Sequence, residues 1–288
     1  MKRLLIFLAL CGGLSCNRNA GGPSAGIITV SIAPFKYFVE EIGGNDFSVN
    51  VMVPAGSNPH VYEPYPAQVN NLRKSVAYIS DGSLGFEITW LDRFYSMNGS
   101  MMKLSLGDKI DLINPSAGHK KVDSAKGDPH FWVSPVSALI IASEIKDLLC
   151  GLNPPQAKKY KKNYSVLAGK IKETDAKARL LFSDFRGRSF MIYHPDLAYF
   201  ARDYNLREVP VEAEGKEPPP KRLMELIDTG RIEKMRTLFV QKEFDSKNAR
   251  EIARETGGRI CVIDPLSEDW LKSVNDIIDD LYRSFKEP

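Results

Sequence analysis

The stretch 154–183, PPQAKKYKKNYSVLAGKIKETDAKARLLFS, decides the architecture of this 288-residue chain. Its more apolar positions recur at alternating four- and three-residue steps, at Tyr160, Tyr164, Leu167, Ile171, Thr174, Ala178 and Leu181. That spacing predicts one amphipathic helix, and the prolines at its start stand where a missing N–H does no harm. At about 1.5 Å per residue the helix would extend roughly 40 Å, the width of a small domain. This length favours a strut between two lobes, although a surface helix of one larger domain would give the same pattern.

Short β-rich apolar runs alternate with helical patterns on both sides of this stretch. The predicted strands are 27–32, 47–53, 76–79, 189–193, 208–211, 237–240 and 259–263. The predicted helices are 35–42, 66–74, 135–149, 197–204, 221–229, 246–255 and 270–285. Such alternation is typical of strand–helix–strand units. We therefore predict two α/β lobes with parallel sheets, residues 27–152 and 184–288, joined by one long rigid backbone helix over 153–183.

The start of the chain has the features of a secretion signal. Lys2 and Arg3 precede the apolar run 4–10, which is followed by Gly12-Gly13-Leu14-Ser15-Cys16. The run is far shorter than the roughly 20 residues that span a bilayer. Leu14-Ser15-Cys16 resembles the lipobox of bacterial lipoproteins, although Gly13 stands where an aliphatic residue is commoner. We expect a signal peptide over 1–15, lipid on Cys16 and a flexible tether over 16–26; a secreted protein without lipid is the alternative.

Charge and cysteine content narrow the partners. The formal net charge of +3, 39 basic minus 36 acidic residues, becomes +1 once Lys2 and Arg3 leave with the signal peptide. The basic residues are interspersed with acidic ones, which argues against nucleic acid as a partner. Cys150 and Cys261 remain in the folded part, each in an apolar stretch, and we expect free thiols there rather than a disulfide.

Three of the four histidines lie in distinctive settings. They are His60 in Ser57-Asn58-Pro59-His60-Val61-Tyr62-Glu63-Pro64, His130 in Asp128-Pro129-His130-Phe131-Trp132, and His194 in Tyr193-His194-Pro195-Asp196. His60 and His194 follow predicted strands, as does Asp264. Ligands of open α/β sheets bind beyond the carboxyl ends of the strands, so residues far apart in sequence can converge there. The fourth histidine, His119, lies among lysines and is left out of the predicted site.

Three imidazoles and one carboxylate would complete a tetrahedral zinc site. We therefore predict a metal site between the lobes, with His60 and His130 from the first lobe and His194 and Asp264 from the second. Taken singly, each histidine could instead be an ordinary core or loop residue, and Asp264 a turn residue. The nitrogen-rich donor set favours zinc over manganese, which prefers more oxygen ligands, although copper or nickel would bind such a set more tightly.

These segments resemble the metal-binding lipoproteins of bacterial ATP-binding-cassette importers, the cluster A-I solute-binding proteins, over nearly the whole mature length. The matching segments are 59–64, 128–132, His194 with 197–206, Glu217-Pro218 and Asp264-Pro265-Leu266. The resemblance implies two lobes around a backbone helix, a metal held by His60, His130, His194 and Asp264, and delivery to a membrane permease powered by a cytoplasmic ATPase. It implies a monomeric carrier on the periplasmic or extracytoplasmic side of the membrane. Many zinc-specific members carry a long His-rich loop, whereas 114–127 is short here and contains only His119, which puts an auxiliary zinc-gathering role in doubt.

Two other functions remain open from the sequence. An envelope zinc hydrolase could use the three histidines, with Asp264 or Glu63 as general base. The chain lacks a His-Glu-x-x-His motif, so we predict a protein that is not an enzyme. A metal-dependent surface adhesion protein is the other alternative.

Overall fold

Two parallel sheets form the framework of the protein, as predicted. The computed structural model describes residues 25–113, 127–212, 218–244 and 247–286. Within these residues the first sheet has the order β2-β1-β3-β4 and the second β6-β5-β7-β8. The first consists of β1 (Ile27–Ile32), β2 (Ser48–Val53), β3 (Ser75–Ser80) and β4 (Met102–Ser105). The second consists of β5 (Ser189–Ile192), β6 (Arg207–Pro210), β7 (Thr237–Gln241) and β8 (Arg259–Ile263).

The central strands are buried along most of their length because helices cover both faces of each sheet. Every residue of β7 is buried, as are the last five of β1. In the first sheet Ile28 pairs with Val49 on one side and Ala77 on the other. In the second, Ile192 pairs with Pro210 and Phe239. This register brings the chain segments that follow β5, β6 and β7 together at one edge.

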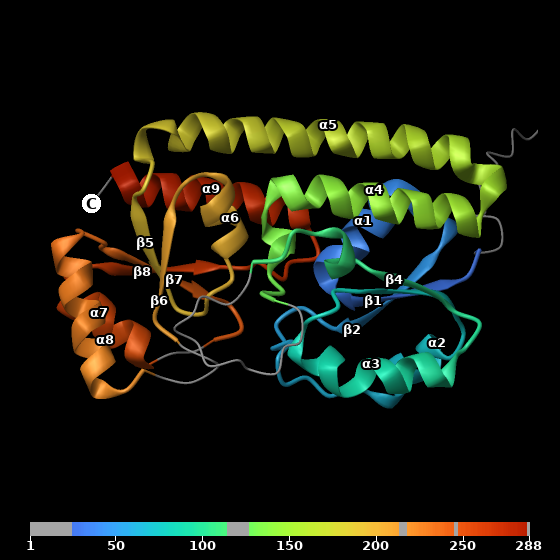
Figure 1. Ribbon diagram of the computed structural model, residues 1–288, viewed down its shortest axis with the longest axis horizontal. Helices are drawn as coiled ribbons and strands as arrows, with labels where there is room; N and C mark the ends of the chain where they lie inside the picture. Colours follow the sequence, from blue (N-terminus) through green and yellow to red (C-terminus); the bar gives the residue numbers. More distant parts are fainter. Residues whose placement is uncertain (1–24, 114–126, 213–217, 245–246, 287–288) are drawn as a thin grey trace, which may run out of the picture.

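Helices flank each sheet on both sides (Figure 1). The first lobe contains α1 (Ala33–Gly43), α2 (Pro66–Leu72), α3 (Gly85–Met97) and α4 (Pro135–Leu152). The second contains α6 (Ala198–Asp203), α7 (Pro220–Ile232), α8 (Lys247–Glu255) and α9 (Trp270–Lys286). Short 3-10 turns lie at Gly44–Asp46, Gly107–Lys109, Phe131–Val133, Pro154–Gln156 and Ser183–Phe185. In Figure 1, α2 and α3 lie on the opposite side of the first sheet from α4.

The long helix α5 (Ala157–Phe182) runs along both lobes (Figure 1). It begins after the turn Pro154–Gln156, has 26 residues and packs on α1 and α4 at one end and on α9 at the other. Its buried face includes Tyr160, Leu167, Ile171, Thr174, Ala178 and Phe182. The apolar spacing of the sequence therefore placed this helix correctly.

The two lobes share one hydrophobic core. Trp132 of the first lobe donates its indole N–H to the carbonyl oxygen of Pro265 at 2.9 Å, and Trp270 donates to the carbonyl oxygen of Trp132 at 2.6 Å. Both indoles are fully buried, and Trp270 packs on Phe38 of α1 with ring centroids 5.1 Å apart. A separate, smaller cluster lies between the second sheet and α7 and α8.

Cys150 and Cys261 are free thiols, one in α4 and the other in β8. In the described parts of the chain, no helix is long and apolar enough to cross a membrane. The predicted signal peptide, Cys16, His119 and Glu217 lie outside the described residues.

Candidate metal centre

His60 lies in the loop between β2 and α2, and the loop is held by backbone contacts. The backbone N–H of His60 donates to the Asn58 side chain at 2.8 Å, and the N–H of Phe86 donates to the carbonyl oxygen of Pro59 at 3.1 Å. Gly85, the first residue of α3, lies against this loop: a Cβ there would come within 2.5 Å of the His60 carbonyl oxygen. The start of α3 therefore sets the position of His60.

His130 precedes the 3-10 turn Phe131–Val133, whose side chains are buried. Asp128 accepts hydrogen bonds from both the backbone N–H of His130, at 2.8 Å, and its Nδ1, at 2.9 Å. The imidazole also lies against Trp132, with ring centroids 5.3 Å apart. These contacts fix the ring so that Nε2 points away from Asp128.

His194 comes two residues after β5, and neighbouring strands hold it in place. Its backbone exchanges two hydrogen bonds with the Gln241 side chain at the end of β7, at 3.2 and 2.6 Å. Its Nδ1 lies 3.2 Å from an oxygen of Glu212, and its ring stacks on Phe244 at 5.0 Å. The imidazole is 8% exposed.

The three imidazoles meet between the lobes. The Nε2 of His194 lies 3.0 Å from that of His60 and 3.3 Å from that of His130, and one ligand nitrogen of each ring lies within 4.8 Å of the others. Ligands about 2.0–2.1 Å from a tetrahedral zinc ion are roughly 3.3 Å apart. The two separations from Nε2 of His194 are therefore close to the edge of a zinc tetrahedron.

The hydrogen bonds at Nδ1 determine what His130 and His194 present to this centre. A carboxylate can only accept, so each Nδ1 must donate its hydrogen, which leaves a lone pair on Nε2 of a neutral ring. Two lone pairs then face each other across 3.3 Å. Neither nitrogen can donate to the other, whereas a cation between them would attract both.

Burial favours the neutral form of His60 and His194. Desolvation, together with the neighbouring imidazoles, lowers the pKa of His60 well below its usual value. Desolvation also lowers the pKa of His194, and this outweighs the opposing effect of Glu212. Neutral imidazole is the form that binds a metal.

Asp264, the fourth predicted ligand, does not belong to the group of three histidines as defined by the 4.8 Å limit. It follows β8, and its Oδ2 lies 3.4 Å from Nζ of Lys242. Its other carboxylate oxygen is buried and has no hydrogen-bond partner among the described residues. Its role as a ligand therefore stays a prediction.

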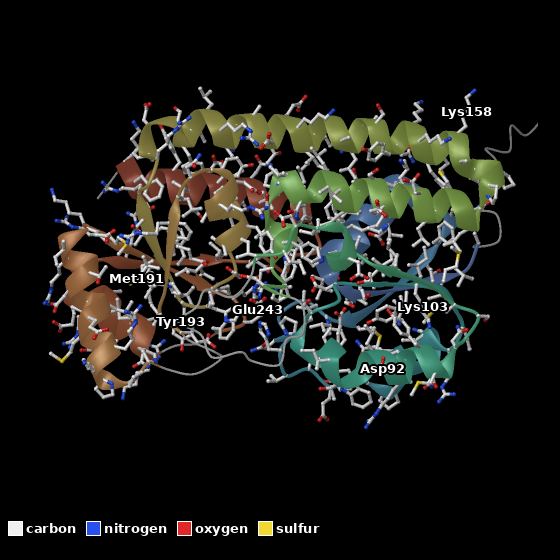
Figure 2. The ribbon with its side chains drawn as sticks, in the orientation of Figure 1. Asp92, Lys103, Lys158, Met191, Tyr193 and Glu243 are labelled. Atoms are coloured by element: carbon white, nitrogen blue, oxygen red, sulfur yellow. The ribbon has the colours of Figure 1, made fainter. Side chains whose placement is uncertain are left out.

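Sequence reasoning assigned no role to three acidic residues near this centre. Asp128 and Glu212 bond the histidines, and Glu243 has a buried oxygen without a partner in the described structure. Burial, and to a lesser extent Asp264, raise the pKa of Glu243; Figure 2 shows it between the two sheets. Only Asp128 carried a sequence signal, since it lies two residues before His130.

Two α/β lobes with parallel sheets are spanned by one long helix, and three imidazoles lie between the lobes. This combination defines a metal-binding solute-binding protein. The chain belongs to the family described as zinc-uptake complex component A, periplasmic, which matches residues 28–284. A crystal structure of ZnuA is similar with a TM-score of 0.82 and 33% identity, covering 89% of this chain and 98% of that one. The prediction of a binding protein rather than an enzyme is therefore confirmed.

Curated relatives agree with this family. A protein of Chlamydia muridarum, provisionally named as metal-binding, is 28% identical over 269 residues, 93% of this chain and 94% of the relative. The zinc-binding protein AdcA of Streptococcus pyogenes serotype M6 is 26% identical over 260 residues, 83% of this chain. The chain spans 50% of the length of that AdcA protein.

Proposed function

We propose that this protein captures Zn²⁺ outside the cytoplasm and delivers it to an ATP-binding-cassette permease. Three nitrogen ligands come from His60, His130 and His194. Asp264 supplies the fourth ligand after it breaks its ion pair with Lys242. The observation that carries the proposal is that His130 and His194 each direct Nδ1 to a carboxylate while their Nε2 atoms lie 3.3 Å apart, an arrangement that a cation stabilises.

The donor set favours zinc as the cargo. Zinc accepts four-coordinate sites of imidazole and carboxylate, whereas manganese prefers more oxygen ligands. Because a closed four-ligand site leaves no position for substrate water, this site suits storage of an ion in transit rather than hydrolysis.

Replacement of single ligands tests this function. Loss of a residue that only hydrogen-bonds a metal ligand weakens metal binding by up to roughly 100-fold. Loss of a ligand itself should weaken zinc binding by more than this in titrations of the purified variants His60→Ala, His130→Ala and His194→Ala. Asp264→Ala should also weaken binding, because it removes the fourth ligand. His119→Ala is the matched control and should bind as the parent does; unchanged affinity in the three ligand variants would contradict the proposal.

We also propose that lipid on Cys16 holds the carrier at the outer side of the membrane, where its permease lies. The thiol of Cys16, directly after the predicted signal peptide, is the site at which the lipid would be attached. Cys16→Ser should move the protein from the membrane fraction to the soluble extracytoplasmic fraction, while its zinc affinity stays the same. A variant that remains with the membrane fraction would argue against lipid on Cys16.

A further inference from the structure

Glu212 lies directly behind the imidazole of His194, and the sheet fixes it there. The pairing of β5 with β6 places Ile192 beside Pro210, and two residues further the backbone N–H of Glu212 donates to the carbonyl oxygen of Tyr193 at 2.9 Å. The carboxylate, 5% exposed, accepts from Nδ1 of His194 at 3.2 Å. Glu212 therefore reaches the metal centre only through His194.

Two of the three imidazoles are held in this way. Asp128 accepts from Nδ1 of His130, whereas no described carboxylate bonds the ring of His60. A divalent cation brings two positive charges into a largely buried site. The carboxylates of Asp128 and Glu212 place two negative charges directly behind the ligand imidazoles, in addition to the charge of the proposed ligand Asp264.

We propose that Glu212 is a positioning residue that also supplies compensating charge for the bound dication, an inference that rests on the proposed function. Its hydrogen bond fixes Nε2 of His194 toward the cation and makes the imidazole a stronger donor. Its charge lowers the cost of placing a dication in a site of low dielectric constant. Both effects act without contact between Glu212 and the metal.

Glu208 of β6, four residues before Glu212, provides a matched control. It is partly buried, and its carboxyl oxygen accepts from the backbone N–H of Leu197 at 2.8 Å rather than from an imidazole. Burial raises the pKa of Glu208 to about 8, so this side chain is mostly protonated at neutral pH. Glu208→Gln therefore removes a nearby carboxyl group without removing much charge.

The experiment compares the parent, E212Q, E212D and E208Q in titrations with Zn²⁺ and with Co²⁺, whose visible absorption reports ligand geometry. E212Q keeps the shape and an accepting oxygen but loses the charge, and it should bind zinc about 10- to 100-fold more weakly while its Co²⁺ spectrum stays like the parent's. E212D keeps the charge but shortens the side chain, so its affinity should lie between those of the parent and E212Q. E208Q should bind as the parent does.

Equal affinity of E212Q and the parent would overturn the inference, as would E212D binding more weakly than E212Q. Thermal unfolding of each metal-free variant separates loss of fold from loss of affinity. If E212Q does not fold, E212D decides: affinity equal to the parent's would show that the hydrogen bond to Nδ1 of His194 does not position this ligand, which overturns the positioning role. Failure of the parent itself to bind zinc would instead refute the proposed function.

Discussion

Protonation of His60 and His194 should set the lower pH limit of metal capture. A proton and the cation compete for the same Nε2 lone pair, so affinity falls where the imidazole becomes protonated. The sequence alone predicts this fall near pH 6.5, the usual histidine pKa. Burial lowers the pKa of both side chains, so we expect zinc affinity to hold through pH 6.5 and to fall only at lower pH.

Zinc titrations in steps from about pH 7.5 to 5 measure this limit against the ordinary histidine value. A tenfold loss per pH unit that already begins above pH 6.5 would contradict the lowered pKa of His60 and of His194.

Short motifs made the three histidines recognisable in the sequence, but no motif identified the acidic residues that bond them. Asp-Pro-His and Asn-Pro-His are unusual local settings, and strand ends predicted that they converge. Glu212 follows an ordinary edge strand, and an acid in such a place is usually a solvated side chain. Its contact with His194 depends on the β5–β6 register, which the sequence does not specify at the level of single residues. The position of the Asp264 carboxylate relative to the imidazoles likewise depends on side-chain conformation, which the sequence does not specify.

At the scale of elements, the start of α3 controls the loop that carries His60. Gly85→Ala would place a Cβ 2.5 Å from the His60 carbonyl oxygen and 2.9 Å from its Cα, so the loop must move. We expect weaker zinc binding although every ligand is retained, as measured by titration. Gly99→Ala, where nothing lies within 4 Å of an added Cβ, is the control. Equal affinity of the two variants would mean that the His60 loop adapts freely.

The same region shows where sequence patterns failed. The strands predicted at 27–32 and 259–263 have the bounds of β1 and β8, and both are rich in β-branched residues. Two elements were missed: β4, a short edge strand with two exposed residues, and α3, in which only Phe86, Glu87 and Phe94 are buried. Neither has a broad apolar face, so tertiary packing rather than local pattern fixes them.

At the scale of the whole molecule, the shared core determines how the carrier can move. A hinge between lobes requires an interface that separates at little cost, yet Trp132 and Trp270 bury both rings and both indole N–H groups across it. The helix α5 packs on both lobes and adds stiffness. The loop of His60, by contrast, is irregular and partly exposed. Entry and release of the ion should therefore depend on loop movement, with the permease displacing His60.

Small-angle scattering tests this rigidity. The metal-free and zinc-loaded protein should have nearly the same radius of gyration, because opening the lobes would expose the tryptophan contacts to water. Trp270→Ala cuts one of these contacts; it should lower the free energy of unfolding by about 3–5 kcal/mol and enlarge the difference between the two states. Trp90→Ala, on α3 and away from the shared interface, should leave the scattering difference unchanged. A large compaction of the parent on zinc binding would show that the lobes close as hinged bodies. Movement of the His60 loop would then not be what controls entry and release of the ion.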